Sequence, residues 1–192
     1  MAGSGRADAH LPHHAFVRRT QLIAETARLR LREMNATDLD FVATMLEHPE
    51  VSRYYERRFE RADAQIWLDR QLARYERHGH GLWLVEERDT RTPVGQVGLA
   101  IQEVEGECHP EIGWLLHRPF WGRGYATEAG AAARDVAFSR WRYSYVISLI
   151  RPVNMPSRRV AERLGMEPGR EVHFHGLTHI MYMSARPSEG VG

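Results

Sequence analysis

A chain of 192 residues with 43% hydrophobic and 27% charged residues has the length and composition of a single globular domain. Its 26 basic residues, all of them arginine, are almost balanced by 25 acidic residues and alternate with them along the chain. This balance argues against a nucleic-acid-binding protein, which gathers basic charge on one face, and no apolar run reaches the ~18 residues of a membrane-spanning helix.

The N-terminal segment shows neither helical nor strand periodicity and has no apolar stretch long enough for a secretory signal. We therefore expect residues 1–25 to be a disordered leader and residues 26–186 to form the folded domain. The single cysteine, Cys108, has no partner for an internal disulfide, which favours a reducing, cytoplasmic location.

The first half of the domain predicts one strand and two helices. Leucine and arginine alternate at 28–34, as in a half-buried strand. Apolar residues at helical spacing follow the capping residues at 35–37 and stop before Pro49, and a second helix is expected from Arg61 to His78. Between the two helices, Val51–Phe59 is expected to be a loop.

The second half predicts mainly strands. Residues 82–87 and 94–104 flank the turn-forming segment DTRTP, and 111–117 adds a third strand to the same meander. Residues 125–140 and 156–164 indicate helices on either side of a nearly all-apolar strand at 144–150. Two strands around Gly176 complete the order β-α-α-β-β-β-α-β-α-β-β, an α/β fold with a mixed, mostly antiparallel sheet flanked by helices.

The strongest chemical signal is the run Trp121–Ala126, WGRGYA, between a predicted strand and a predicted helix. Glycines keep side chains away from the backbone, and the N–H groups at a helix N-terminus bind a diphosphate. Arg123 adds a full positive charge. Two glycines also fit a plain tight turn, but the third glycine and distant acidic residue of a nicotinamide-dinucleotide site are missing.

Two longer motifs carry a family resemblance. The run EIGWLLHRPFWGRGYATEA, followed further on by SLIRPVNMPSRRVAERLGM, resembles GNAT acetyltransferases, and among them the subgroup of ribosomal-protein N-terminal acetyltransferases (RimJ/RimL-like). The likeness extends from Thr26 to Ser184. One departure is Trp121, where the wider superfamily has Gln or Arg; this exchange is common in the subgroup.

The resemblance implies a GNAT fold whose sheet splays into a V and binds acetyl-CoA in the gap, where the strands at 111–117 and 144–150 part. It implies that backbone amides hold the pyrophosphate and that the pantetheine arm pairs with a strand edge. The residues implied are Arg123, Gly124, Tyr125, Ala126 and Thr127 for the pyrophosphate, and Leu115, Leu116, His117 and Asn154 for the pantetheine.

Direct acetyl transfer needs a base for the amine proton and an acid for the departing thiolate, but no covalent nucleophile, so Cys108 is not required. Glu111 lies where many relatives carry the carboxylate base; its alternative role is that of a solvent-facing strand residue. The rival carboxylates Glu103, Glu105 and Glu107 lie near Gly106 in an expected turn.

The second motif contributes the candidate acid. Asn154 at a helix start caps that helix, and Ser157, three residues on, faces the same side. By resemblance Ser157 protonates the coenzyme A thiolate, with Tyr182 and Tyr143 as fallback acids. Plain cap and first-turn roles are the alternatives for Asn154 and Ser157.

On the acceptor side, Tyr54 and Tyr55 in the arginine-rich loop are expected to line the substrate groove. His173, His175 and His179 lie close together on the last two strands, but no Cys/His pair at zinc-like spacing accompanies them, so we expect no metal.

The expected function is acetyl transfer from acetyl-CoA to a primary amine, on a protein or peptide N-terminus or on a small molecule. The alternatives are a non-catalytic module of the same fold that binds acyl-CoA, and a structural protein without affinity for coenzyme A. No nucleic-acid or membrane partner is predicted, and homodimers are common among relatives of the family.

Overall fold

The N-terminal boundary of the fold differs from the prediction. The computed structural model describes residues 20–55 and 57–187. Residues 1–19 of the predicted leader lie outside the described residues, but its last part is a strand: β1 (Leu22–Glu25) pairs antiparallel with β2 (Leu29–Arg32). The segment LIAE has no alternation of apolar and polar residues, unlike LRLR in β2, so the sequence did not indicate a strand before residue 26.

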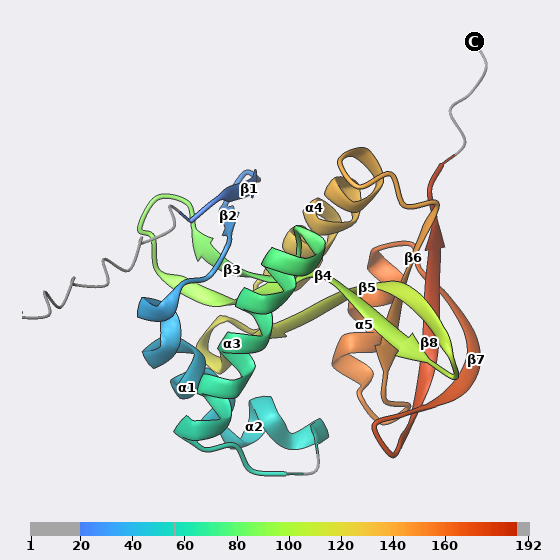
Figure 1. Ribbon diagram of the computed structural model, residues 1–192, viewed down its shortest axis with the longest axis horizontal. Helices are drawn as coiled ribbons and strands as arrows, with labels where there is room; N and C mark the ends of the chain where they lie inside the picture. The colour runs from blue at the N-terminus through green and yellow to red at the C-terminus, as the bar shows by residue number, and fades with distance from the viewer. Residues whose placement is uncertain (1–19, 56, 188–192) are drawn as a thin grey trace, which may run out of the picture.

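The described chain forms one open sheet in the order β1-β2-β3-β4-β5-β6-β8-β7 (Figure 1). Neighbouring strands are antiparallel except β5 and β6, which run parallel. This confirms the mixed, mostly antiparallel sheet. The remaining strands are β3 (Leu82–Glu87), β4 (Pro93–Val104), β5 (Glu107–Leu116), β6 (Tyr145–Ile150), β7 (Glu167–Phe174) and β8 (Leu177–Ala185).

The helices follow the predicted positions with one correction. Long helices are α1 (Leu39–Glu47), α3 (Arg61–His78), α4 (Tyr125–Ser139) and α5 (Met155–Arg163), and Gly79 ends α3 in a left-handed conformation. The predicted loop at Val51–Phe59 is partly wrong, because α2 (Pro49–Ser52) and the 3-10 turn η2 (Arg53–Tyr55) occupy its first residues. Pro49 stops α1 but also suits the first position of α2, where its missing N–H costs nothing. Two further 3-10 turns are η1 (Ala36–Asp38) and η3 (Arg118–Phe120).

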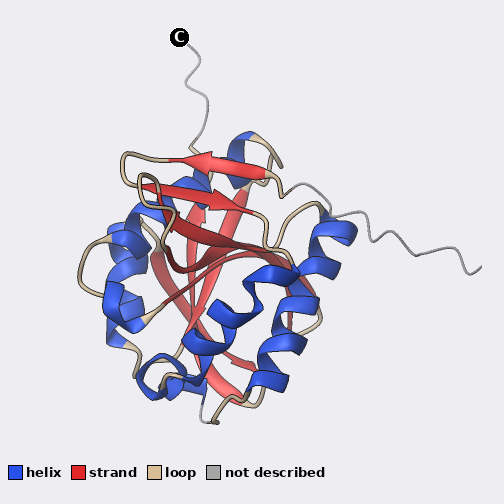
Figure 2. Ribbon diagram, turned by 90° about the vertical axis from the view of Figure 1, so that its left-hand side faces the viewer, coloured by secondary structure: helices blue, strands red, loops and turns tan. Residues whose placement is uncertain are grey.

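Helices cover both faces of the sheet (Figure 2). The Trp67 indole of α3 donates to the Gln96 side chain of β4 (2.8 Å), which places α3 on one face. On the other face, the Trp114 indole of β5 donates to Ser157 of α5 (3.3 Å). Because side chains alternate along a strand, Glu111 faces α3 whereas Trp114 faces α5. No helix within 20–55 or 57–187 is long and apolar enough to cross a membrane.

Candidate active site

A gap opens in the middle of the sheet, where β5 and β6 separate. The two strands pair at one position only, Glu111 opposite Ile147. Just beyond it, the buried Ser148 hydroxyl of β6 donates to the Ile112 carbonyl (2.6 Å), so a side chain takes the place of a backbone partner. Beyond this bond the splayed half of β5 has no neighbouring strand on that side, which leaves room for an extended ligand to pair with its edge.

The backbone groups that face this gap alternate along β5. The Leu115 carbonyl points toward Gly95 of β4, where an added Cβ would meet it at 2.5 Å. The His117 N–H donates to Val94 (2.9 Å) and its carbonyl accepts from Phe120 (3.0 Å). The backbone N–H and carbonyl groups of Leu115 and His117 therefore point away from the gap. Those of Leu116 and, by the same alternation, Trp114 point toward it.

The glycine turn leads directly into α4. Gly122 and Gly124 have φ of 77° and 79°, the left-handed region that other residues rarely adopt. The first helical bond runs from the Glu128 N–H to the Gly124 carbonyl (3.0 Å), so the N–H groups of Tyr125, Ala126 and Thr127 precede the helical ladder. An atom added at Gly122 would meet nothing within 4 Å. The turn therefore has both the unsatisfied donors and the open space that a diphosphate needs.

The turn is held against the splayed strand by Trp121. Its indole N–H donates to the Leu116 carbonyl (2.7 Å), one of the groups that faces the gap. The Arg123 side chain is about half exposed and lies 3.8 Å from Glu87. The predicted pyrophosphate residues and the edge of β5 thus belong to one continuous surface.

Glu111 lies where the two strands part, and its carboxylate is held in place. Gln102 donates to Oε2 (2.7 Å) and the Leu149 N–H donates to Oε1 (3.2 Å). Burial raises the pKa of Glu111 above the usual carboxyl range, although the hydrogen bonds from Gln102 and Leu149 and the charge of Arg74 oppose the shift. A carboxylate with a raised pKa is a stronger base than a free one, and Glu111 is fixed beside the gap, so it is suited to accept a proton there.

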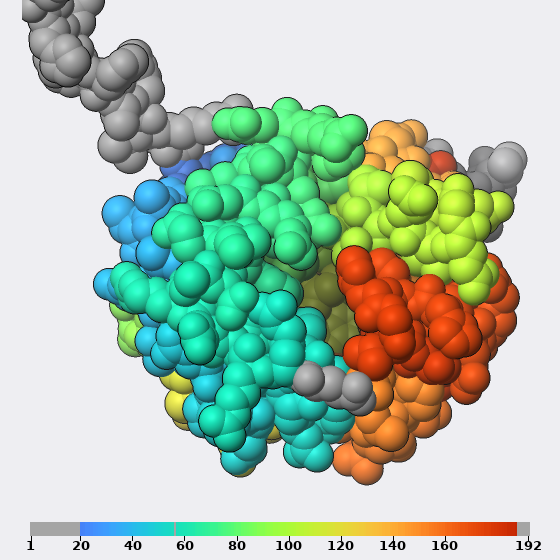
Figure 3. Space-filling view, turned by 60° about the horizontal axis from the view of Figure 1, so that its bottom comes forward, coloured from blue at the N-terminus to red at the C-terminus, as the bar shows by residue number. Residues whose placement is uncertain are grey.

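Small residues surround Glu111 on the α3 face of the sheet. Ala100 lies opposite Glu111, and Gly113 and its partner Gly98 occupy the next positions on that face. Figure 3 shows a hollow in this region, between the teal atoms of the α2–α3 region and the red β7–β8 hairpin. At Gly98 the backbone of Gly81 and Leu82 fills the place of a side chain, whereas a Cβ added at Gly113 would meet only the Leu82 side chain, at 3.4 Å.

The predicted acceptor tyrosines behave differently from one another. Tyr55 packs edge-on against Phe59 and Trp67, with ring centroids 5.4 and 6.0 Å away. Tyr55 is 38% exposed, yet desolvation by the groups packed around it and, second, the charge of Glu111 raise its pKa to about 12, so Tyr55 is neutral. Tyr54 contributes through its backbone: its carbonyl accepts from Arg151 (3.1 Å), which ties η2 to the chain just after β6.

The second motif is assembled on the opposite face. The side-chain oxygen Oδ1 of Asn154 accepts from the Ser157 N–H (3.2 Å), which confirms the predicted cap. The Trp114 indole donates to the Ser157 hydroxyl oxygen, so the Ser157 O–H proton remains available for donation. Of the fallback acids, Tyr182 also accepts, from Arg158 Nε (3.0 Å), and so keeps its hydroxyl proton, whereas Tyr143 is hydrogen-bonded to His80 Nε2 (3.0 Å).

Several contributors to this site were not identified from the sequence. Trp114 and Ser148 lie within the two motifs but were given no role, Gln102 lies in neither motif, and the contacts of all three depend on how the strands and helices meet. Knowing that β4 and β5 form a hairpin was enough to place Gln102 near Glu111, but its hydrogen bond was not foreseen.

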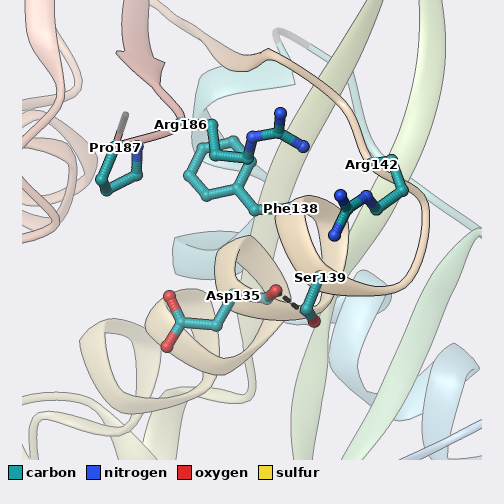
Figure 4. A pocket seen from close by; sticks show the side chains of 6 residues that line it. All are labelled: Asp135, Phe138, Ser139, Arg142, Arg186 and Pro187. Carbon is teal, nitrogen blue, oxygen red and sulfur yellow. Dashed lines mark hydrogen bonds between the residues drawn. The ribbon is translucent and has the colours of Figure 1, made fainter. Parts of the chain in front are cut away.

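Other features lie outside this surface. Cys108 is exposed on β5, and no group of three or more His, Cys, Asp or Glu in the described ranges has a metal-binding arrangement. A shallow pocket of about 300 Å³ lies at the C-terminal end of α4, opposite the glycine turn (Figure 4). It is lined by Asp135, Phe138, Ser139, Arg142, Arg186 and Pro187.

A family model described as an acetyltransferase (GNAT) domain matches residues 28–167, which include the gap, the glycine turn and the second motif. The chain belongs to the GNAT acetyltransferase family. This confirms the resemblance and makes the protein an acyltransferase of a family that uses acetyl-CoA to acetylate amines.

The relatives of this GNAT protein agree in fold. The Bacillus subtilis protein YkkB, which is uncharacterized, is 30% identical over 154 residues, covering 80% of this chain and 89% of that one. An acetyltransferase from Agrobacterium tumefaciens has a TM-score of 0.75 at 26% identity, with 96% of this chain and 100% of that one covered. RimL, a ribosomal L7/L12 alpha-N-protein acetyltransferase solved with coenzyme A, has a TM-score of 0.70 at 15% identity, covering 86% and 98%.

Proposed function

We propose that this GNAT protein transfers acetyl from acetyl-CoA directly to a primary amine, with Glu111 as base and Ser157 as acid. The observation that carries the proposal is the position of Glu111, whose carboxylate is held by Gln102 and Leu149 where β5 and β6 part. The acetyl donor would reach this point from the α5 face and the amine from the α3 face.

The donor would be bound by backbone groups. The N–H groups of Gly124, Tyr125, Ala126 and Thr127, with that of Arg123, would hold the pyrophosphate at the start of α4. The directions of the backbone groups support Trp114 and Leu116, rather than Leu115 and His117, as the residues that pair with pantetheine. Asn154 already caps α5 through its side-chain oxygen, and its amide N–H₂ is left to contact the pantetheine.

The chemistry then needs two proton transfers. The amine nitrogen attacks the thioester carbonyl carbon and Glu111 takes a proton from it, which keeps the nitrogen from carrying a positive charge. The C–S bond breaks, the acetyl group stays on nitrogen, and the thiolate receives a proton from the Ser157 hydroxyl. No covalent enzyme intermediate forms, which agrees with an exposed Cys108 outside the gap.

The acceptor is a peptide N-terminus or a small-molecule amine. An aromatic wall of Tyr55, Phe59 and Trp67 beside Glu111 supports an acceptor with an apolar part next to its amine. The structural neighbour RimL acts on the N-terminus of a ribosomal protein, which supports the peptide among these acceptors. A non-catalytic acyl-CoA-binding module is disfavoured by a carboxyl group with a raised pKa in the gap.

The first test is calorimetric titration of the purified protein with acetyl-CoA, with coenzyme A and NADH as comparisons. We expect micromolar binding of acetyl-CoA and coenzyme A, and none of NADH. Candidate amines and peptides are then screened by release of free thiol. Absence of acetyl-CoA binding would refute the proposal, and binding without turnover on any amine class would leave the non-catalytic module in its place.

Ser157→Ala tests the acid. We expect kcat to fall about tenfold with little change in acetyl-CoA affinity. The effect is smaller than that of losing a base, because a thiol with a pKa near 8.5 leaves partly as the anion. Steady-state kinetics measure the change in kcat. Ser139→Ala is the matched control, because the Ser139 hydroxyl donates to the Asp135 backbone carbonyl at the far end of α4. If Ser157→Ala keeps the wild-type kcat, Ser157 is a first-turn residue only.

A further inference from the structure

Glu128 lies in the first turn of α4, in the motif YATEA, and three donors from the N-terminal hairpin converge on it. The Thr26 hydroxyl (2.6 Å) and the Arg28 N–H (3.0 Å) donate to Oε1, and Arg28 Nε (2.7 Å) donates to Oε2. The guanidinium Nη2 lies 2.6 Å from Oε2. These bonds join the turn between β1 and β2 to the helix that follows the glycine turn.

The same guanidinium also contacts the glycine turn itself. Arg28 Nη1 donates to the Arg123 carbonyl (3.0 Å), and the guanidinium carbon lies 4.7 Å from the centre of the Tyr125 ring. Nη2 would be 3.5 Å from a Cβ at Gly124. One side chain therefore contacts Arg123 and Tyr125, within the stretch whose N–H groups are proposed to bind the pyrophosphate, and Glu128, the residue that follows this stretch.

Glu128 is negatively charged, and Arg28 compensates this charge beside the glycine turn. Burial alone would raise the pKa of Glu128, but the hydrogen bonds from Thr26 and Arg28 outweigh it and lower the pKa, so Glu128 is ionised. A carboxylate in the first turn stabilises a helix whose N-terminus binds no anion. When an anion is bound at the same N-terminus, the carboxylate repels it. Arg28 neutralises that carboxylate from the side of the hairpin.

We propose that Arg28 is a positioning residue for coenzyme A: it fixes the Arg123 carbonyl and the first turn of α4, and it neutralises Glu128 beside the pyrophosphate. This proposal rests on the proposed binding of acetyl-CoA at the glycine turn. The proposal assigns Arg28 no phosphate contact, because each of its three nitrogens already contacts Glu128 or Arg123. The Arg123 side chain, which is more loosely paired, is left for that contact.

The proposal makes an unusual prediction for a pair of variants. Arg28→Gln leaves Glu128 uncompensated and should weaken acetyl-CoA binding about tenfold, which corresponds to about 1.4 kcal/mol. Adding Glu128→Gln to it removes the repulsion, so the double variant should bind more tightly than Arg28→Gln alone, within about threefold of wild type. Glu128→Gln alone keeps the positive charge of Arg28 and should stay within about threefold.

The measurements are the Kd of acetyl-CoA by calorimetry and the KM for acetyl-CoA against kcat. In Arg28→Gln the KM should rise in step with Kd while kcat at saturating acetyl-CoA stays within twofold. Arg30→Gln is the matched control, because Arg30 pairs with Glu25 (3.2 Å) within the same hairpin and should leave Kd unchanged. If Arg28→Gln does not fold, Arg28→Lys keeps the charge without the planar fork and should weaken binding about threefold.

The outcomes distinguish a failure of this proposal from a failure of the proposed function on which it rests. If the wild-type protein binds no acetyl-CoA, the proposed function fails. If the wild type binds and Arg28→Gln binds equally well, or the double variant binds no more tightly than Arg28→Gln, only the positioning role is overturned. If the pair had a purely structural role, the double variant would bind acetyl-CoA no more tightly than Arg28→Gln, because each lost bond would weaken the site further.

Discussion

Gly124→Glu is expected to weaken acetyl-CoA binding by at least a hundredfold, about 2.7 kcal/mol. Gly124 is the residue before the first turn of α4 and has a φ of 79°. A glutamate there adds a negative charge where the pyrophosphate is proposed to bind, and placing like charges together at a binding site costs several kcal/mol. Calorimetric titration with acetyl-CoA measures the loss.

The substitution also strains the backbone, because a residue other than glycine in the left-handed region costs about 1–2 kcal/mol. Gly106→Glu is the matched control: Gly106 has a φ of 87°, lies in the turn between β4 and β5, and has nothing within 4 Å of an added Cβ. Its strain is similar, but it lies at the far end of β5 from the glycine turn. Equal affinities of the two variants would show that the phosphate site is elsewhere.

The parts of the fold that the sequence predicted are those with local signals. Helix α3 was placed residue for residue, because an apolar stripe ends at a glycine that can adopt the left-handed conformation. The hairpin of β3 and β4 follows from two strand-like segments on either side of the turn-forming segment DTRTP. The order of elements then needed no knowledge of long-range contacts.

The elements that were missed depend on contacts distant in sequence. Strand β1 is fixed by pairing with β2 and by the bonds from Thr26 and Arg28 to a helix about a hundred residues later. Likewise α2 and η2 are held in place partly by the bond from Arg151 to the Tyr54 carbonyl. Neither the periodicity of four residues nor a loop rich in arginine and tyrosine reveals such partners.

In the candidate site, too, some residues could be identified from the sequence and others only from the structure. The glycine turn, Asn154 and Ser157 belong to motifs that could be recognised, and the cap formed by Asn154 is present. The direction of each backbone group along β5 depends on its register with β4, so the shift from Leu115 and His117 to Trp114 needed the structure. Arg28 lies in the alternating segment at 28–34 and Glu128 in the run YATEA, yet only the fold shows that they meet.

Glu111→Gln is expected to lower kcat at neutral pH by at least a hundredfold, the lower end of what a positioned general base contributes, while the Kd of acetyl-CoA stays within twofold. An amide cannot take a proton from the amine, but it has the size of the carboxyl group and can still bond Gln102 and Leu149 after Gln102 reverses its amide. Glu103→Gln is the matched control, because Glu103 is an exposed carboxylate on neighbouring β4.

The pH dependence distinguishes the base from a structural carboxyl group. Because burial raises the pKa of Glu111, wild-type kcat/KM should increase as the pH rises through a value above the usual carboxyl range, and this limb should disappear in Glu111→Gln. The raised pKa also means that protonated Glu111 stabilises the folded protein at low pH, and that this stability is lost as the pH rises through that pKa. Removing the charge should therefore leave the Tm at neutral pH unchanged or higher. A variant that loses turnover together with Tm, or that retains the acidic limb, would show that Glu111 supports the fold and that another group takes the proton.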